Sequence, residues 1–190
     1  MFCSIAGMAR VHDCVPVIFG GPVTMTTTTI HLPDSDATAA AGARLAPFLE
    51  GGMIVTLSGE LGAGKTTLVR GCLRELGWAG PVKSPTYTLV EHYLVSSLYF
   101  YHFDFYRFTD PGEWETAGLA DCFREDAVCI VEWPEHVAGL LPAADLAVTL
   151  VHPQRADECG RHCMLEARTE AGERCLMAIA TTAGSWPRLP

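Results

Sequence analysis

A run of nine residues, Gly59–Thr67, constrains this chain more than any other part of its sequence. Its letters, GELGAGKTT, fit the pattern G-x-x-x-x-G-K-[ST] with every fixed position in register. The run that precedes it, Met53–Ser58, is apolar without alternation, which is typical of a strand buried on both faces. A helical segment follows to about Leu76, and Gly77 provides its stop. The sequence therefore predicts a buried strand, a glycine-rich loop and a helix in direct succession.

This succession predicts a phosphate-binding loop. Glycines let backbone N–H groups turn inward around phosphate oxygens, and the helix N-terminus adds partial positive charge there. We expect Lys65 to reach the β- and γ-phosphates, Thr66 to ligate Mg²⁺ and Thr67 to contact the α-phosphate. The glycine order G-x-x-G-x-G does not fit the dinucleotide pattern G-x-G-x-x-G. The candidate nucleotide-binding residues are Gly59, Glu60, Leu61, Gly62, Ala63, Gly64, Lys65, Thr66 and Thr67.

A second apolar run supplies a candidate metal-binding acid. Ala127–Val131 is fully apolar, and Glu132 follows it directly. Phosphate-binding loops of this kind need an acid that holds the metal, and it usually ends a neighbouring strand. We therefore expect Glu132 to act with Thr66 on Mg²⁺; the alternative is a surface carboxylate at a strand end. We expect Glu135 to be a charge at a helix N-terminus.

The segment His102–Arg107 supplies a second acid. On a strand, His102, Asp104 and Tyr106 share one face, while Phe103 and Phe105 share the other and pack into the core. Asp104 is the candidate for orienting an attacking water or assisting Mg²⁺. The alternative is that the polar face is the solvated side of a hairpin.

A short polar segment, Ser84–Tyr87, lies after the predicted loop and helix. In many proteins with such loops this stretch is a switch whose threonine senses the γ-phosphate. From the residues alone, a plain turn at Ser84-Pro85-Thr86-Tyr87 is an equal alternative.

The remaining pattern predicts an α/β fold, with a mostly parallel sheet and an antiparallel hairpin portion. The hairpin is Tyr87–Leu94 and Leu98–Phe105, joined at Val95–Ser97. Further strands are expected at Ile30–Leu32, Leu146–Val151 and Arg161–Arg168. A helix is expected at Ala37–Leu49, one or two short helices at Pro111–Phe123 and a short helix at Pro134–Leu140, while Cys175–Ala180 fits either strand or helix.

Composition limits the class of protein and its partners. The chain has 190 residues, enough for one domain, and no uncharged apolar run approaches the roughly 18 residues of a membrane span. The net charge of −9 makes it a poor stand-alone ligand for nucleic acid.

We expect residues 1–29 to be an N-terminal extension, disordered or preceding a natural start at Met25, with an extra strand Val15–Phe19 as the alternative. Residues 30–182 are expected to form one domain and 183–190 a flexible tail.

The eight cysteines indicate a cytoplasmic protein with reduced, buried thiols. None of them forms Cys-x-x-Cys, and several lie inside apolar runs. A zinc site from Cys159, His162 and Cys163, with His152 upstream, is the alternative, although its spacing fits no standard site.

Four motifs together resemble one family closely, the small ATPase of the bacterial tRNA threonylcarbamoyladenosine system, called TsaE or YjeE. They are Gly59–Thr67, Ser84–Tyr87, His102–Arg107 and Val131–Glu135, in the same order and spacing, and the resemblance spans about Ile30 to Arg168. It implies a three-layer P-loop NTPase-like fold. It also implies ATP and Mg²⁺ as cofactors, and slow ATP hydrolysis that depends on the partner subunits TsaB and TsaD. Contact with tRNA would then be indirect, through those partners.

The resemblance also assigns residues. Asp104, Lys65 and Glu132 are the candidate catalytic residues, and Thr66 and Glu132 the metal ligands. Trp133 matches a tryptophan beside the nucleotide and Thr38 an N-terminal threonine near it, while Arg161 matches a C-terminal basic position weakly.

Two other functions compete with an ATPase subunit of a tRNA-modifying complex. A P-loop small-molecule kinase needs an acceptor site and usually an arginine-rich lid, and no dense arginine cluster follows Glu132. A non-catalytic nucleotide-sensing module would use ATP only to control docking. A GTPase is disfavoured, because the chain contains no asparagine for the Asn-Lys-x-Asp guanine reader.

Overall fold

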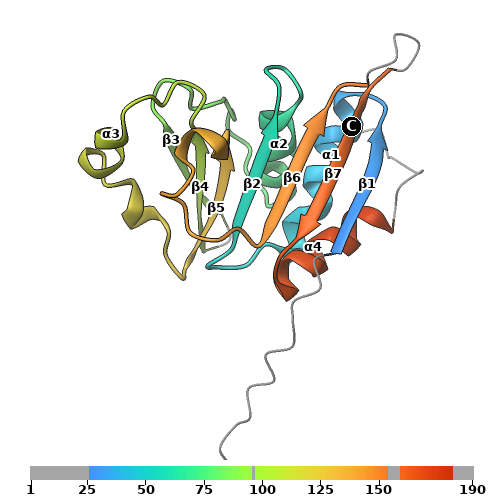
Figure 1. The fold of residues 1–190 in the computed structure, drawn as a ribbon. Helices are drawn as coiled ribbons and strands as arrows, with labels where there is room; N and C mark the ends of the chain where they lie inside the picture. Colours follow the sequence, from blue (N-terminus) through green and yellow to red (C-terminus); the bar gives the residue numbers. More distant parts are fainter. Residues whose placement is uncertain (1–25, 96, 154–158, 182–190) are drawn as a thin grey trace, which may run out of the picture.

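The computed structural model describes residues 26–95, 97–153 and 159–181, which form a seven-stranded sheet with helices on its faces (Figure 1). The strands are β1 (Thr26–Leu32), β2 (Ile54–Gly59), β3 (Val90–Val95), β4 (Leu98–Asp104), β5 (Ala127–Glu132), β6 (Leu146–Val151) and β7 (Arg161–Ala167). The helices are α1 (Ser35–Leu45), α2 (Lys65–Glu75), α3 (Pro111–Thr116) and α4 (Glu170–Ala180), with 3₁₀ helices η1 (Ala46–Phe48), η2 (Leu119–Cys122) and η3 (Pro134–Val137).

The centre of the sheet is parallel and its two sides are antiparallel. The strand order is β1-β7-β6-β2-β5-β4-β3, and the pairs β6–β2, β2–β5 and β5–β4 are parallel. At one side β3 forms the expected antiparallel hairpin with β4. At the other, β7 runs antiparallel to both β6 and β1, a portion that the sequence pattern did not predict. Five of the seven strands share one direction, so the mostly parallel α/β fold is confirmed.

The two faces of the sheet are covered differently. Helices α1, α2 and α4 lie on one face, behind the sheet in Figure 1. On the other face α3, η2, η3 and their connections cover β4, β5 and part of β2, over a cluster in which Phe103 stacks on Phe105 and Phe123. Within the described residues no helix covers β7 and β1 on this second face, where His31 and Met164 are exposed. The third layer of the fold is therefore thin and partial.

Two strands begin well away from the predicted residue, while the other strand bounds shift by at most one residue. Strand β1 begins at Thr26 rather than Ile30, because the polar Thr26–Thr29 pair with β7, so these residues belong to the folded domain and not to an extension. Strand β3 begins at Val90 rather than Tyr87, because the Pro85 carbonyl accepts the N–H groups of two later residues and closes a turn. The predictions for residues 1–25 and 182–190 lie outside the described residues.

Helical segments occur where the sequence predicts them, although Pro111–Phe123 divides into α3 and η2 and the segment from Pro134 is a 3₁₀ helix that ends at Val137. The side chain of Asp34 accepts the Ala37 N–H at 2.7 Å and starts α1, and the predicted end of that helix is the separate η1. Gly77, with a φ of 98°, follows the end of α2 as expected. The ambiguous segment Cys175–Ala180 belongs to α4.

The cysteines whose surroundings are described are free thiols, and most of them are buried. Burial raises the pKa of the Cys129 and Cys163 thiols to about 12. Cys163 faces the core while Cys159 is exposed, so the two do not converge on one point. No group of three or more His, Cys, Asp or Glu that could hold a metal occurs in the described ranges, and the zinc alternative has no support there.

The longest helices in the described ranges have 11 residues. None of these helices has the length and apolar character needed to cross a bilayer.

Two glycines set the distance between α1 and α2, and so the position of the loop that leads into α2. A Cβ at Gly42 would collide with the Leu68 carbonyl oxygen, and a Cβ at Gly71 with that of Ala39. Because both obstacles are backbone atoms, a larger residue can be accommodated only if the helices move apart.

We predict that Gly71→Ala lowers the free energy of unfolding by about 1–3 kcal/mol, the usual range for an overpacked contact. The measurement is urea denaturation, with Glu75→Ala, an exposed position at the end of the same helix, as the control. Equal unfolding midpoints for the Gly71 variant and the unaltered chain would contradict this account of the packing.

Candidate functional site

The loop between β2 and α2 lies at the carboxyl edge of the central strands, where β2 sits between β5 and β6. Gly59, with a φ of 135°, ends β2 where a Cβ would collide with the Leu150 carbonyl oxygen. Gly64 has a φ of 107° and precedes α2 without any side-chain cap. By contrast, Asp34 and Thr169 cap α1 and α4. The first N–H groups of α2 are thus left for an anion.

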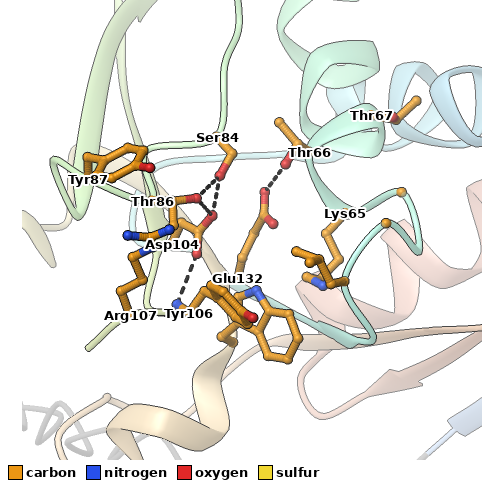
Figure 2. Close-up of a pocket in the computed structure, with 14 residues that line it drawn as sticks. Lys65, Thr66, Thr67, Ser84, Thr86, Tyr87, Asp104, Tyr106, Arg107 and Glu132 are labelled. Carbon is orange, nitrogen blue, oxygen red and sulfur yellow. Dashed lines mark hydrogen bonds between the residues drawn. The ribbon is translucent and has the colours of Figure 1, made fainter. Parts of the chain in front are cut away.

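A cavity of about 460 Å³ opens beside this loop (Figure 2). Three parts of the chain surround it: the loop with the start of α2, the turn before β3, and the segments that end β4 and β5. The residues that line it are Leu61, Gly62, Gly64, Lys65, Thr66, Thr67, Ser84, Thr86, Tyr87, Asp104, Tyr106, Arg107, Glu132 and Trp133.

Two buried carboxylates stand side by side in this cavity. Asp104 and Glu132 are directly opposite each other in the register of β4 and β5, and each is 2% exposed. Glu132 is therefore not a surface carboxylate, and His102 and Asp104 do not form a solvated hairpin face, so both alternatives are wrong. Adjacent like charges in a buried site require nearby donors or cations.

Glu132 receives two hydrogen bonds on one oxygen. The Thr66 hydroxyl donates to Oε1 at 2.8 Å, and His102 Nε2 lies 2.8 Å from the same atom. Glu132 therefore joins the start of α2 to the middle of β4.

Asp104 receives its hydrogen bonds from the neighbouring turn and from its own strand end. The hydroxyls of Ser84 and Thr86 both donate to Oδ2, the latter at 2.7 Å, and the Tyr106 N–H donates to Oδ1 at 3.0 Å (Figure 2). The segment Ser84–Tyr87 is thus tied directly to the candidate catalytic acid.

Lys65 is held by the loop itself. Its Nζ donates to the carbonyls of Gly59 at 2.6 Å and Glu60 at 2.9 Å, and it lies 3.9 Å from the centre of the Trp133 ring. Burial lowers the pKa of the Lys65 amine below its usual value, and the nearby carboxylates of Glu132, Asp104 and Glu135 offset only part of this effect. Trp133 itself has a left-handed backbone with a φ of 60°.

The structure places most predicted site residues on the cavity, but not all of them. Thr38, Gly59, Glu60 and Ala63 do not line it. Thr38 is fully buried behind the loop, where its hydroxyl donates to the Asp34 carbonyl at 2.9 Å and accepts from Arg161 Nη1 at 3.0 Å.

The sequence assigns no individual role to four of the cavity residues, Ser84, Tyr87, Tyr106 and Arg107. Tyr87 and Arg107 lie at the cavity wall, and the Arg107 guanidinium sits 4.5 Å from the centre of the Tyr87 ring. Their position in the Ser84–Tyr87 and His102–Arg107 motifs was the available signal. A tyrosine and an arginine in separate segments do not by themselves predict that the two side chains stack on each other.

Comparisons with known proteins match this chain along most of its length. The family model described as "Threonylcarbamoyl adenosine biosynthesis protein TsaE" matches residues 32–162. A protein named tRNA threonylcarbamoyladenosine biosynthesis protein TsaE, from Haemophilus influenzae, is 41% identical over 82% of this chain and 99% of its own length. A Bacillus subtilis protein of the same name is 38% identical over 60% of this chain and 72% of its own length. The crystal structure of Bacillus subtilis YdiB superposes with a TM-score of 0.66 at 27% identity, over 83% of this chain and 96% of that one.

We predict that Thr86→Val lowers the free energy of unfolding by about 1.5–3 kcal/mol, the usual contribution of a hydrogen bond to a charged group. Thr86→Ser should retain most of the stability, because it keeps the hydroxyl that donates to Asp104. Urea denaturation tests both variants, with the exposed Thr88→Val in the same turn as the control. The contact with Asp104 would be unimportant if Thr86→Val and Thr88→Val unfolded alike.

Proposed function

Because the chain belongs to the TsaE family of threonylcarbamoyl adenosine biosynthesis proteins, we propose that it is the ATP-hydrolysing subunit that supports formation of N6-threonylcarbamoyladenosine in tRNA, next to the anticodon. It would be an enzyme that uses ATP and Mg²⁺. It would act with TsaB and TsaD in the cytoplasm and reach tRNA only through them. The net charge of −9 agrees with indirect contact, since a surface that binds RNA gains affinity from Lys and Arg.

One observation carries the proposal: the convergence of Lys65, Asp104 and Glu132 on a single cavity beside the uncapped start of α2. Backbone N–H groups at such a helix start bind phosphate oxygens. The cation of Lys65 would move from the carbonyls of its own loop to the β- and γ-phosphates. Trp133, whose ring now contacts that amine, stands where it would meet the nucleotide.

The residues present fit a magnesium ion. The Thr66 hydroxyl donates its proton to Glu132 and keeps lone pairs for a metal. Glu132 adds a buried carboxylate, and oxygen ligands of this kind are those that Mg²⁺ takes. Thr66 and Glu132 would hold the ion, which neutralises charge on the phosphates when bound.

Asp104 is the candidate for orienting the attacking water, but three hydrogen bonds now occupy it. For this role Ser84 or Thr86 would have to release the carboxylate. The 84–87 turn would then act as the switch, and its movement would be the step that partner subunits promote. This arrangement agrees with slow hydrolysis by the chain alone.

We predict that the purified chain hydrolyses ATP slowly with Mg²⁺ and faster when TsaB and TsaD are added. Lys65→Ala and Glu132→Ala should each lower the rate by at least about 100-fold, because each removes a charged group that stabilises the reacting phosphates. The measurement is phosphate release. Lys83→Ala is the matched control, since Lys83 is the only other lysine and is exposed.

Different results would favour the other two functions. Transfer of phosphate to a metabolite, with no response to the partners, would favour a small-molecule kinase. An Asp104→Ala chain that binds ATP and still supports the tRNA modification would favour a nucleotide-sensing module.

A further inference from the structure

His102 is a buried polar residue to which the steps above give no part. It lies in the middle of β4 and is fully buried. It is not among the residues that line the cavity. An apolar side chain would fill such a core position without the cost of burying a polar ring.

The only hydrogen bond that the ring makes among the described residues goes to Glu132. Nε2 lies 2.8 Å from Oε1, and it must be the donor because an ionised carboxylate only accepts. The other ring nitrogen, Nδ1, is buried and has no partner in the described part of the chain. Among the described residues the ring therefore forms hydrogen bonds only with the Glu132 carboxylate.

The same oxygen also accepts the Thr66 hydroxyl at 2.8 Å. Two donors on different elements, β4 and α2, thus fix Oε1 and leave the carboxylate little freedom to rotate. No hydrogen bond within the described residues reaches the second oxygen, Oε2. With Oε1 held in this way, Oε2 is the atom left for a cation or for water bound to one.

We propose that His102 is a positioning residue that orients Glu132 toward the metal ion of the nucleotide complex. This inference rests on the proposed function, because it requires that Mg²⁺ and ATP bind in the cavity. Removing a side chain that hydrogen-bonds to a metal ligand and orients it commonly weakens metal binding by about 10–100-fold.

The test measures the binding of a non-hydrolysable ATP analogue by calorimetry, once in EDTA and once across a Mg²⁺ titration. His102→Leu should leave the affinity in EDTA unchanged and raise the half-saturating Mg²⁺ concentration by about 10–100-fold. His102→Gln, whose side-chain amide can still donate a hydrogen bond, should recover most of the Mg²⁺ response. His92→Leu, an exposed histidine on the paired strand β3, is the matched control.

A double-variant comparison separates positioning from a general role in packing. Combining His102→Leu with Glu132→Gln should change the Mg²⁺ response no more than Glu132→Gln alone, because His102 acts through that carboxylate. Equal weakening of binding with and without Mg²⁺, or full additivity of the two changes, would overturn the inference. If His102→Leu does not fold, His102→Met replaces it as the apolar variant. Loss of the Mg²⁺ response in His102→Met with its retention in His102→Gln supports the inference, and equal responses in the two variants overturn it.

The outcome for the unaltered chain distinguishes this inference from the function on which it rests. Absence of nucleotide binding, or binding that Mg²⁺ does not affect, would overturn the proposed function and the inference with it. Normal Mg²⁺-dependent binding in both the unaltered chain and folded His102→Leu would overturn the inference alone.

Discussion

Two carboxylates placed opposite each other on adjacent parallel strands are the constraint around which the site is built. Asp104 and Glu132 are register partners and are almost completely buried. Such a pair is unfavourable unless donors and cations surround it. The chain supplies hydroxyls from two segments, a ring nitrogen from β4 and the amine of Lys65. A divalent cation would add to this compensation, which is a physical reason for the two acids to stand together.

The rest of the fold holds this arrangement in place. The close contact of α1 with α2, made possible by Gly42 and Gly71, sets the helix that carries Lys65 and Thr66. The parallel pairing of β2 with β5 puts the loop and Glu132 at the same edge of the sheet. Asp145 lies at the opposite edge of the sheet, where β2 and β6 begin. Its carboxylate accepts the Ile54 N–H at 2.9 Å and the Thr169 hydroxyl at 2.7 Å. The site therefore depends on pairings between parts of the chain far apart in sequence.

The sequence predicts those parts of the structure that rest on local patterns. The loop at Gly59–Thr67, the apolar strands before it and before Glu132, and the alternation around Asp104 all follow from periodicity and motif spacing. Strand β1 was predicted too short, because its first four residues are threonines that join the sheet through β7, more than 130 positions away. Sequence patterns also do not predict contacts between distant segments. The hydrogen bonds from the hydroxyls to Asp104, and from the His102 ring to Glu132, depend on how the strands and turns pack together.

The most direct test of this account is a crystal structure of the chain with a non-hydrolysable ATP analogue and Mg²⁺. We predict phosphates on the N–H groups at the start of α2, a metal at about 2.1 Å from the Thr66 hydroxyl oxygen, and Lys65 Nζ moved from the carbonyls of Gly59 and Glu60 to the phosphates. A nucleotide bound elsewhere, with Lys65 still on those carbonyls, would contradict it.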